Sequence, residues 1–169
     1  MNQQACASSR VQFVEGSVQQ VDRYCALLQA RLGVERETTS ACGNPLPGEL
    51  RDEIDGLRDM QPHYRVWGGY EGRGLVIRSD EPVDFHPDGR VVNVVPVESL
   101  AAAVHRANVA TQTVGVFPAS RKAALRNALA ASGVQRVVVL GQAVMFETGI
   151  SHDGFYPLQR FVRWVNDEG

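Results

Sequence analysis

The feature that most constrains the fold is the regular alternation of strand-like and helix-like segments after residue 89. "RVVNVVPV" (90–97), "TQTVGVF" (111–117) and "QRVVVLG" (135–141) are rich in β-branched residues and predict strands. "ESLAAAVHRAN" (98–108) and "SRKAALRNALAASG" (120–133) lie between them and have the apolar spacing of helices. Strands that alternate with helices predict crossover connections and a parallel sheet.

The second of these helices has residues typical of helix ends on both sides. Ser120 is expected to cap the second helix, and Gly133 to end it. The last strand is almost continuously apolar, as expected when both faces of a sheet are covered. After Pro157 we expect a short terminal helix, with apolar residues to bury at Leu158, Phe161, Val162 and Trp164.

The first half of the chain predicts further elements, each delimited by Gly, Pro or a capping residue. They are a strand at 10–16, a helix at 17–33, a more polar helix at 48–60, and a hairpin of two strands at 64–69 and 73–79. Ser17 is a plausible N-cap, and Cys25 falls on the apolar face of its helix, where it is expected to pack in the core. The fold class is therefore α/β, a mostly parallel twisted sheet with helices on both faces, in one domain over residues 1–169.

Charge and cysteine usage exclude several classes of function. A net charge of -2 gives no electrostatic footprint for nucleic acid or for an anionic membrane. Three cysteines and four histidines lie at no metal-ligand spacing, so no metal is expected. No apolar run approaches the roughly 20 residues of a membrane span. We expect a reduced, cytoplasmic protein.

The stretch "QQACASS" (3–9) has the composition of a nucleophile turn. Its small residues let a carbonyl approach Cys6 closely, and the backbone N–H of Cys6 could point at a developing oxyanion. No second cysteine stands two residues away, so Cys6 is not part of a redox pair. The residues alone leave open whether Cys6 is a catalytic nucleophile or a small buried side chain.

The loop at 142–154 is the second candidate for lining a site, because ligands bind beyond the carboxyl ends of strands in such sheets. It contains His152 and Asp153, which could act as an acid/base or orienting pair near the thiol. His-Asp-Gly is also ordinary turn chemistry, and that interpretation is the favoured one.

Five stretches, in order along the chain, carry a resemblance to a known family: "NQQACASSRVQFVEG", "RVVNVVPVESLAAAV", "TQTVGVFP", "SGVQRVVVLG" and "HDGFYPLQRFVRWV". The first resembles the nucleophile segment of the aldehyde dehydrogenase superfamily. The remainder resembles one branch of that superfamily, the long-chain fatty acyl-CoA reductases of the bacterial bioluminescence type.

The resemblance implies an aldehyde dehydrogenase-like catalytic domain of an acyl-thioester reductase. Cys6 would attack an acyl-CoA or acyl-carrier-protein thioester, expel coenzyme A or the carrier thiol, and hold an acyl-enzyme, with its own N–H in the oxyanion hole. A hydride from NADPH or NADH would then release the aldehyde. Met145 and Phe146, in a loop where the superfamily builds part of its substrate pocket, are expected to contact the acyl chain. The full enzyme is expected to be a homo-oligomer, with the strands between Tyr64 and Ser79 as candidate exchanged or edge elements.

The chain departs from the superfamily pattern in two respects. In the superfamily, the nicotinamide-binding domain, the side-chain oxyanion donor and the general-base Glu all precede the nucleophile. In this sequence the candidate nucleophile is already the sixth residue. "FHPDGR" (85–90) stands where a Glu-containing cofactor-ribose motif is expected, and His86 or Glu81 would have to take the place of that Glu. We therefore expect an excised catalytic domain that binds the cofactor poorly.

Two alternatives stay open on the residues. One is a cofactor-independent cysteine thioesterase or acyltransferase, for which His152 or His86 would have to serve as the base. The other is a non-catalytic oligomerisation domain in which Cys6 is incidental.

Overall fold

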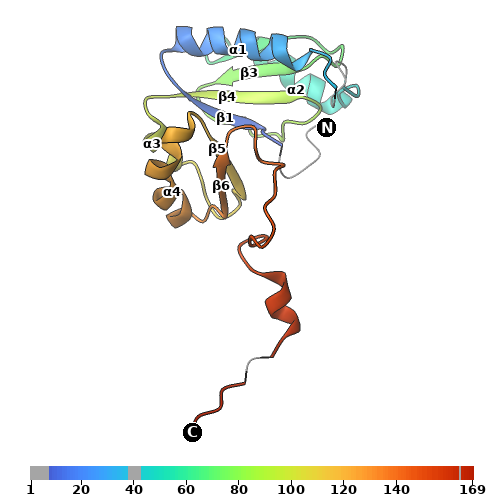
Figure 1. The fold of residues 1–169 in the computed structure, drawn as a ribbon. Helices are drawn as coiled ribbons and strands as arrows, with labels where there is room; N and C mark the ends of the chain where they lie inside the picture. Colours follow the sequence, from blue (N-terminus) through green and yellow to red (C-terminus); the bar gives the residue numbers. More distant parts are fainter. Residues whose placement is uncertain (1–7, 38–42, 164) are drawn as a thin grey trace. The chain divides into compact units, whose positions relative to one another are not determined.

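The computed structural model describes residues 8–37, 43–163 and 165–169, and it divides the chain into two units, Met1–Ala103 and Val104–Gly169 (Figure 1). The first unit contains most of the regular structure. Its elements are β1 (Val11–Glu15), α1 (Val18–Leu32), α2 (Gly48–Arg58), β2 (Tyr64–Trp67), β3 (Leu75–Ser79) and β4 (Val91–Val97). All six were predicted from the sequence within a few residues of these bounds.

The strands of the first unit form one sheet in the order β1-β4-β3-β2. β4 pairs parallel with β1 on one side and with β3 on the other, while β2 pairs antiparallel with β3. The register places Asn93 opposite both Val11 of β1 and Ile77 of β3. A mostly parallel sheet and an antiparallel hairpin are thus both confirmed.

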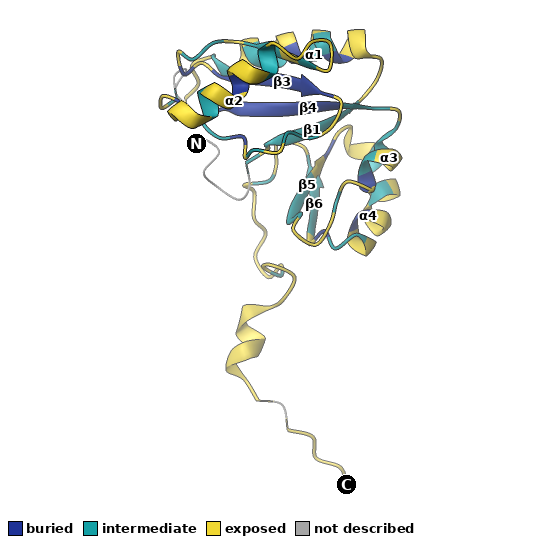
Figure 2. Cartoon of the chain, turned by 180° about the vertical axis from the view of Figure 1, so that it is seen from behind, coloured by how far each residue is buried: buried dark blue, intermediate teal, exposed yellow. Residues whose placement is uncertain are grey.

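The two helices cover opposite faces of this sheet. Val21 and Cys25 of α1 pack against Val76, Val92 and Val94. Ile54 of α2 packs with Leu75, Ile77 and Val91, whose side chains alternate with the first set along the strands. Figure 2 accordingly shows β3 and the start of β4 as buried strands, which explains their nearly continuous apolar sequences.

The ends of α1 follow the predicted signals. The side chain of Ser17 accepts a hydrogen bond from the backbone N–H of Gln20, and the Gln20 side chain accepts one from the backbone N–H of Ser17. This reciprocal capping box satisfies two donors that a helix start otherwise leaves open. Gly33 follows the last residue of the helix as its C-cap.

The second unit forms around β5 (Thr113–Val116) and β6 (Arg136–Val139), a parallel pair, with α4 (Lys122–Ala131) between them. Leu129 of α4 packs with Val104, Val116 and Val134 in a small core. β5 pairs with β6 and not with β4, so the prediction of one parallel sheet through residues 90–141 is wrong. The reason is that β1 and β3 already occupy both edges of β4.

Two predicted helix boundaries in this region are also wrong. The helix expected at 98–108 is the short α3 (Leu100–Val104). Ser120 does not cap α4: it lies inside a 3-10 turn, η1 (Ala119–Arg121), and the residue before α4 is Arg121, which makes no side-chain cap. Pro118 begins this turn, and the chain tightens into it before the α-helix starts.

The terminal segment differs most from expectation. Pro157–Phe161 forms a 3-10 turn, η2, rather than an α-helix. Its side chains are not buried: Leu158 is 80% and Phe161 is 85% exposed, and Val162 is exposed as well. Trp164 lies outside the described residues.

β6 is half-buried along its length, so the prediction that both its faces are covered is also wrong. Within the described ranges, no helix has the length and apolarity needed to cross a membrane.

Candidate functional site

The predicted nucleophile, Cys6, lies outside the described residues, as does Cys42. Its catalytic role and the role of its backbone N–H stay predictions. The structure does define the strand that follows it: the carbonyl of Arg10 accepts a hydrogen bond from the backbone N–H of Asn93 at 2.8 Å. This bond ties the residue before β1 to β4.

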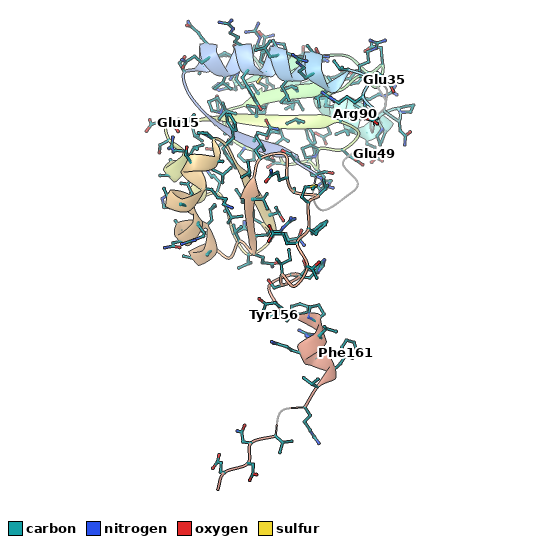
Figure 3. All side chains as sticks on the ribbon, viewed as in Figure 1. Glu15, Glu35, Glu49, Arg90, Tyr156 and Phe161 are labelled. Carbon is teal, nitrogen blue, oxygen red and sulfur yellow. The ribbon has the colours of Figure 1, made fainter. Side chains whose placement is uncertain are left out.

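The start of β1 lies at the amino end of the parallel strands. In Figure 3, Glu15 at the end of β1 and Arg90 just before β4 are labelled at opposite ends of the sheet. The connector at 80–90 leads from the carboxyl end of β3 to the amino end of β4, and His86 lies in it. One guanidinium nitrogen of Arg10, Nη1, lies 3.4 Å from Nδ1 of His86. The structure therefore brings His86 to the strand that follows Cys6.

Asn93 anchors this region, and the sequence analysis did not single it out. It is fully buried in β4. Its side-chain amide donates to Ser79 Oγ at 2.7 Å and to the Ile77 carbonyl at 3.1 Å, and its Oδ1 accepts from the backbone N–H of Val83 at 3.1 Å. A polar residue inside the apolar run "RVVNVVPV" was the available signal.

Cys25 behaves as the sequence predicted, as a packing residue. It is fully buried against the sheet. Burial, with a smaller contribution from the nearby Asp22 carboxylate, raises the pKa of its thiol from 9.0 to about 12. A thiol that stays protonated at neutral pH is a poor nucleophile. Cys25 is therefore no alternative to Cys6.

Met145 and Phe146, the expected acyl contacts, are exposed in the second unit. Arg136 holds this part of the loop: its guanidinium donates to the carbonyls of Ala143 at 2.5 Å and Met145 at 2.9 Å, and its Cζ lies 4.5 Å from the centre of the Phe146 ring. The loop conformation is thus fixed by β6. Contact with an acyl chain stays a prediction for both residues.

His152 and Asp153 lie in a tight turn, as the favoured interpretation predicted. The backbones of His152 and Phe155 exchange hydrogen bonds of 2.9 and 3.2 Å, and both Asp153 and Gly154 have positive φ. Nδ1 of His152 lies 3.1 Å from Oδ2 of Asp153, and Gln112 donates to Oδ1. Their acid/base role stays a prediction.

Among the residues that the structure describes, no three His, Cys, Asp or Glu side chains lie close enough together to hold an ion. The charged residues that do cluster form structural pairs instead. Arg78, buried in β3, donates to Asp22 of α1 at 2.8 Å and to the Pro62 carbonyl at 2.9 Å.

Sequence comparison identifies the class of protein. The family described as "Acyl-CoA reductase (LuxC)" matches residues 1–164, which include both the Cys6 segment and the terminal segment. The chain belongs to this acyl-CoA reductase family.

Three of the curated relatives carry the printed name "Long-chain acyl-protein thioester reductase". The protein of Vibrio harveyi is 27% identical over 169 residues, which cover 99% of this chain and 35% of that protein. The Photorhabdus laumondii protein is 37% identical over 100 residues, 57% of this chain and 20% of its own length. The Aliivibrio fischeri protein is 32% identical over 111 residues, 61% of this chain and 23% of its own. The chain thus spans about a third of the length of the Vibrio relative.

Proposed function

We propose that this chain carries the acyl-transfer chemistry of an acyl-thioester reductase, with Cys6 as the nucleophile. The observation that carries the proposal is the family match over residues 1–164, which includes the Cys6 segment. The Cys6 sulfur attacks the carbonyl of an acyl-CoA or acyl-protein thioester. The thiol of the donor leaves, and the acyl group stays on Cys6 as a thioester. The backbone N–H of Cys6 stabilises the oxyanion between these two states.

Release of an aldehyde from that acyl-enzyme needs a hydride, for which the family resemblance implies NADPH or NADH. The described residues do not fit such a dinucleotide. In parallel α/β sheets the pyrophosphate binds at the helix start after the first strand, over a glycine-rich loop. Here the connection from β1 to α1 is only Gly16–Ser17, with a single glycine, and Ser17 and Gln20 bond each other's backbone N–H groups. We therefore assign acyl transfer to this chain's own residues and derive no hydride step from them.

The remaining expectations are part of the same proposal. We propose an aldehyde dehydrogenase-like catalytic domain, working in the cytoplasm as part of a homo-oligomer. Met145 and Phe146 would contact the acyl chain, and coenzyme A would be the thiol product when acyl-CoA is the donor. The exposed apolar loop around these two residues supports an apolar ligand.

The test is intact mass after incubation with a long-chain acyl-CoA. The parent chain should gain one acyl group, and the Cys6→Ala variant should gain none. Cys25→Ala is the matched control and should be acylated like the parent, because the Cys25 thiol is buried and protonated. Continuous release of free fatty acid would instead favour the thioesterase alternative. An unmodified parent chain would contradict the proposal.

A further inference from the structure

One face of the β5–β6 pair is turned away from α4. Val114 and Val137 lie opposite each other in the register, and both pack against the small core to which α4 contributes. Side chains alternate along a strand, so Arg136 and Val138 face the other way. Gly115, which lies opposite Val138, adds no side chain to this outer face. The outer face of the pair is therefore open to whatever the following loop places there.

The chain after β6 folds back on this strand pair. A Cβ at Gly115 would lie 3.2 Å from both the Cα and the Cδ1 of Leu140, so the absence of a side chain at Gly115 leaves room for Leu140. Two successive turns then reverse the chain. The N–H of Gln142 donates to the Val139 carbonyl, and the N–H of Met145 donates to the Gln142 carbonyl, each at 3.0 Å. The loop is thus folded by its own backbone.

Arg136 uses its whole side chain to hold this loop. Its guanidinium donates to the carbonyls of Ala143 and Met145, and its Cζ lies 4.5 Å from the centre of the Phe146 ring. A planar guanidinium can donate in two directions and stack on a ring at the same time, which an ammonium group cannot do. Met145 and Phe146 are nevertheless 70% and 63% exposed. Arg136 therefore fixes two large apolar side chains without burying them, which is typical of a binding surface.

Building on the proposed function, which supplies an acyl group as the apolar ligand, we propose that Arg136 is the positioning residue of an acyl-chain surface formed by Leu140, Met145 and Phe146. An alkyl chain offers no hydrogen-bonding group, so it binds through the apolar area that it removes from water. A loop that is already held in place loses less conformational entropy when the chain binds. Arg136 acts through the loop and the Phe146 ring, and it does not itself contact the alkyl chain.

The test uses photoreactive dodecanol, with a diazirine at the end of its chain, as the probe. The probe is uncharged, so the charge of Arg136 cannot attract it, and it has no thioester, so labelling does not depend on acylation of Cys6. After irradiation and digestion, mass spectrometry should locate the label in residues 140–146. Photoreactive butanol should label these residues at least about tenfold less, because it buries fewer CH₂ groups.

Four variants separate the surface from its support. Phe146→Gln should lower labelling about tenfold, because it removes a large apolar side chain. Arg136→Gln should lower it about tenfold, through the loss of hydrogen bonds from a charged group. Arg136→Lys keeps a charged donor but cannot stack on Phe146, and it should lower labelling about threefold. Val109→Gln is the matched control: Val109 is an exposed apolar residue of the same unit, outside this loop, and its variant should be labelled like the parent.

Other outcomes would overturn the inference. Equal labelling of the parent and both Arg136 variants would show that Arg136 does not position the surface. A label located mainly in 155–163 would place the acyl chain elsewhere. If Phe146→Gln weakens self-association in sedimentation velocity but not labelling, a second copy covers the surface instead. Acylation by acyl-CoA without labelling at 140–146 would contradict this surface alone, whereas labelling there in a chain that is never acylated would contradict the proposed role of Cys6 alone.

Discussion

Asp22 of α1 bridges two arginine side chains of the sheet, the buried Arg78 and the exposed Arg65. Its two carboxylate oxygens each accept a hydrogen bond at 2.8 Å, Oδ1 from Arg78 and Oδ2 from Arg65. The Arg78 side chain is only 5% exposed. Asp22→Asn would remove the nearest counter-ion of that buried guanidinium, so we expect a loss of about 3 kcal/mol in the free energy of unfolding. Urea denaturation followed by circular dichroism measures it.

Asp80→Asn is the matched control for this prediction. Asp80 lies 3.8 Å from Arg78 and 2.7 Å from His63, and its carboxylate is largely exposed. Solvent screens such a pair, and its loss should cost less than about 1 kcal/mol. Equal costs for the two substitutions would show that Arg78 does not depend on Asp22.

Cys25 makes stability depend on pH in the alkaline range. Burial raises the pKa of this thiol from 9.0 to about 12, so the folded chain keeps a proton that the unfolded chain releases above pH 9. Stability is therefore unaffected below pH 9 and falls as pH rises towards 12, by up to about 1.4 kcal/mol per pH unit. Unfolding measured from pH 8 to 11 should show this slope.

Cys25→Ala isolates the contribution of the thiol. Burial also raises the pKa of Tyr24 from 10.0, so some alkaline loss remains in the variant. The difference in unfolding free energy between parent and variant should shrink as pH rises above 9. A constant difference over this range would mean that the thiol ionises equally in both states.

The burial of Cys25 and the contact between Arg10 and His86 show what can and cannot be predicted from single residues. The core position of Cys25 was predictable, because it follows from helical spacing within one segment. The contact between Arg10 and His86 joins residues 76 positions apart and depends on the parallel pairing of β1 with β4. No local pattern encodes that pairing, so the contact between Arg10 and His86 could not be predicted from the sequence.

At the scale of elements, α1 and α4 start in different ways although both starts carry a serine. Ser17 accepts from the Gln20 N–H in a capping box, whereas Ser120 lies inside a 3-10 turn and caps nothing. Ser17→Ala should therefore destabilise the chain by about 1 kcal/mol. Ser120→Ala, the matched control, should change stability by less than about 0.5 kcal/mol. Comparable losses in thermal unfolding would contradict this assignment.

The elements that were predicted well are those with signals at both ends. α1 has Ser17 and Gly33, and the hairpin has the glycines between Trp67 and Leu75. The sequence analysis did not predict that β5 and β6 form a separate two-stranded sheet, because periodicity identifies strands but not their neighbours. The decisive fact was that β1, from the start of the chain, occupies the free edge of β4.

At the scale of the whole chain, apolar side chains separate into two populations. Those of β3, β4 and their covering helices are buried in two clusters. Most of the large apolar side chains that stay exposed lie in 144–165. The sequence predicted that this terminal segment was apolar, but the expectation of burial assumed a partner surface. The parts of the chain that the structure describes do not provide one to Leu158 or Phe161.

This exposed segment should make the chain associate with itself. Exposed apolar area of this kind favours contacts that remove it from water. We expect sedimentation velocity to show concentration-dependent association at micromolar concentrations. The double variant Leu158→Gln/Phe161→Gln should weaken it by more than tenfold, because each side chain contributes roughly 1.5–3 kcal/mol when buried. Leu27→Gln, at an exposed apolar position of α1, is the control and should associate like the parent. A monomeric parent chain, or an equal effect of Leu27→Gln, would show that the terminal segment does not drive association.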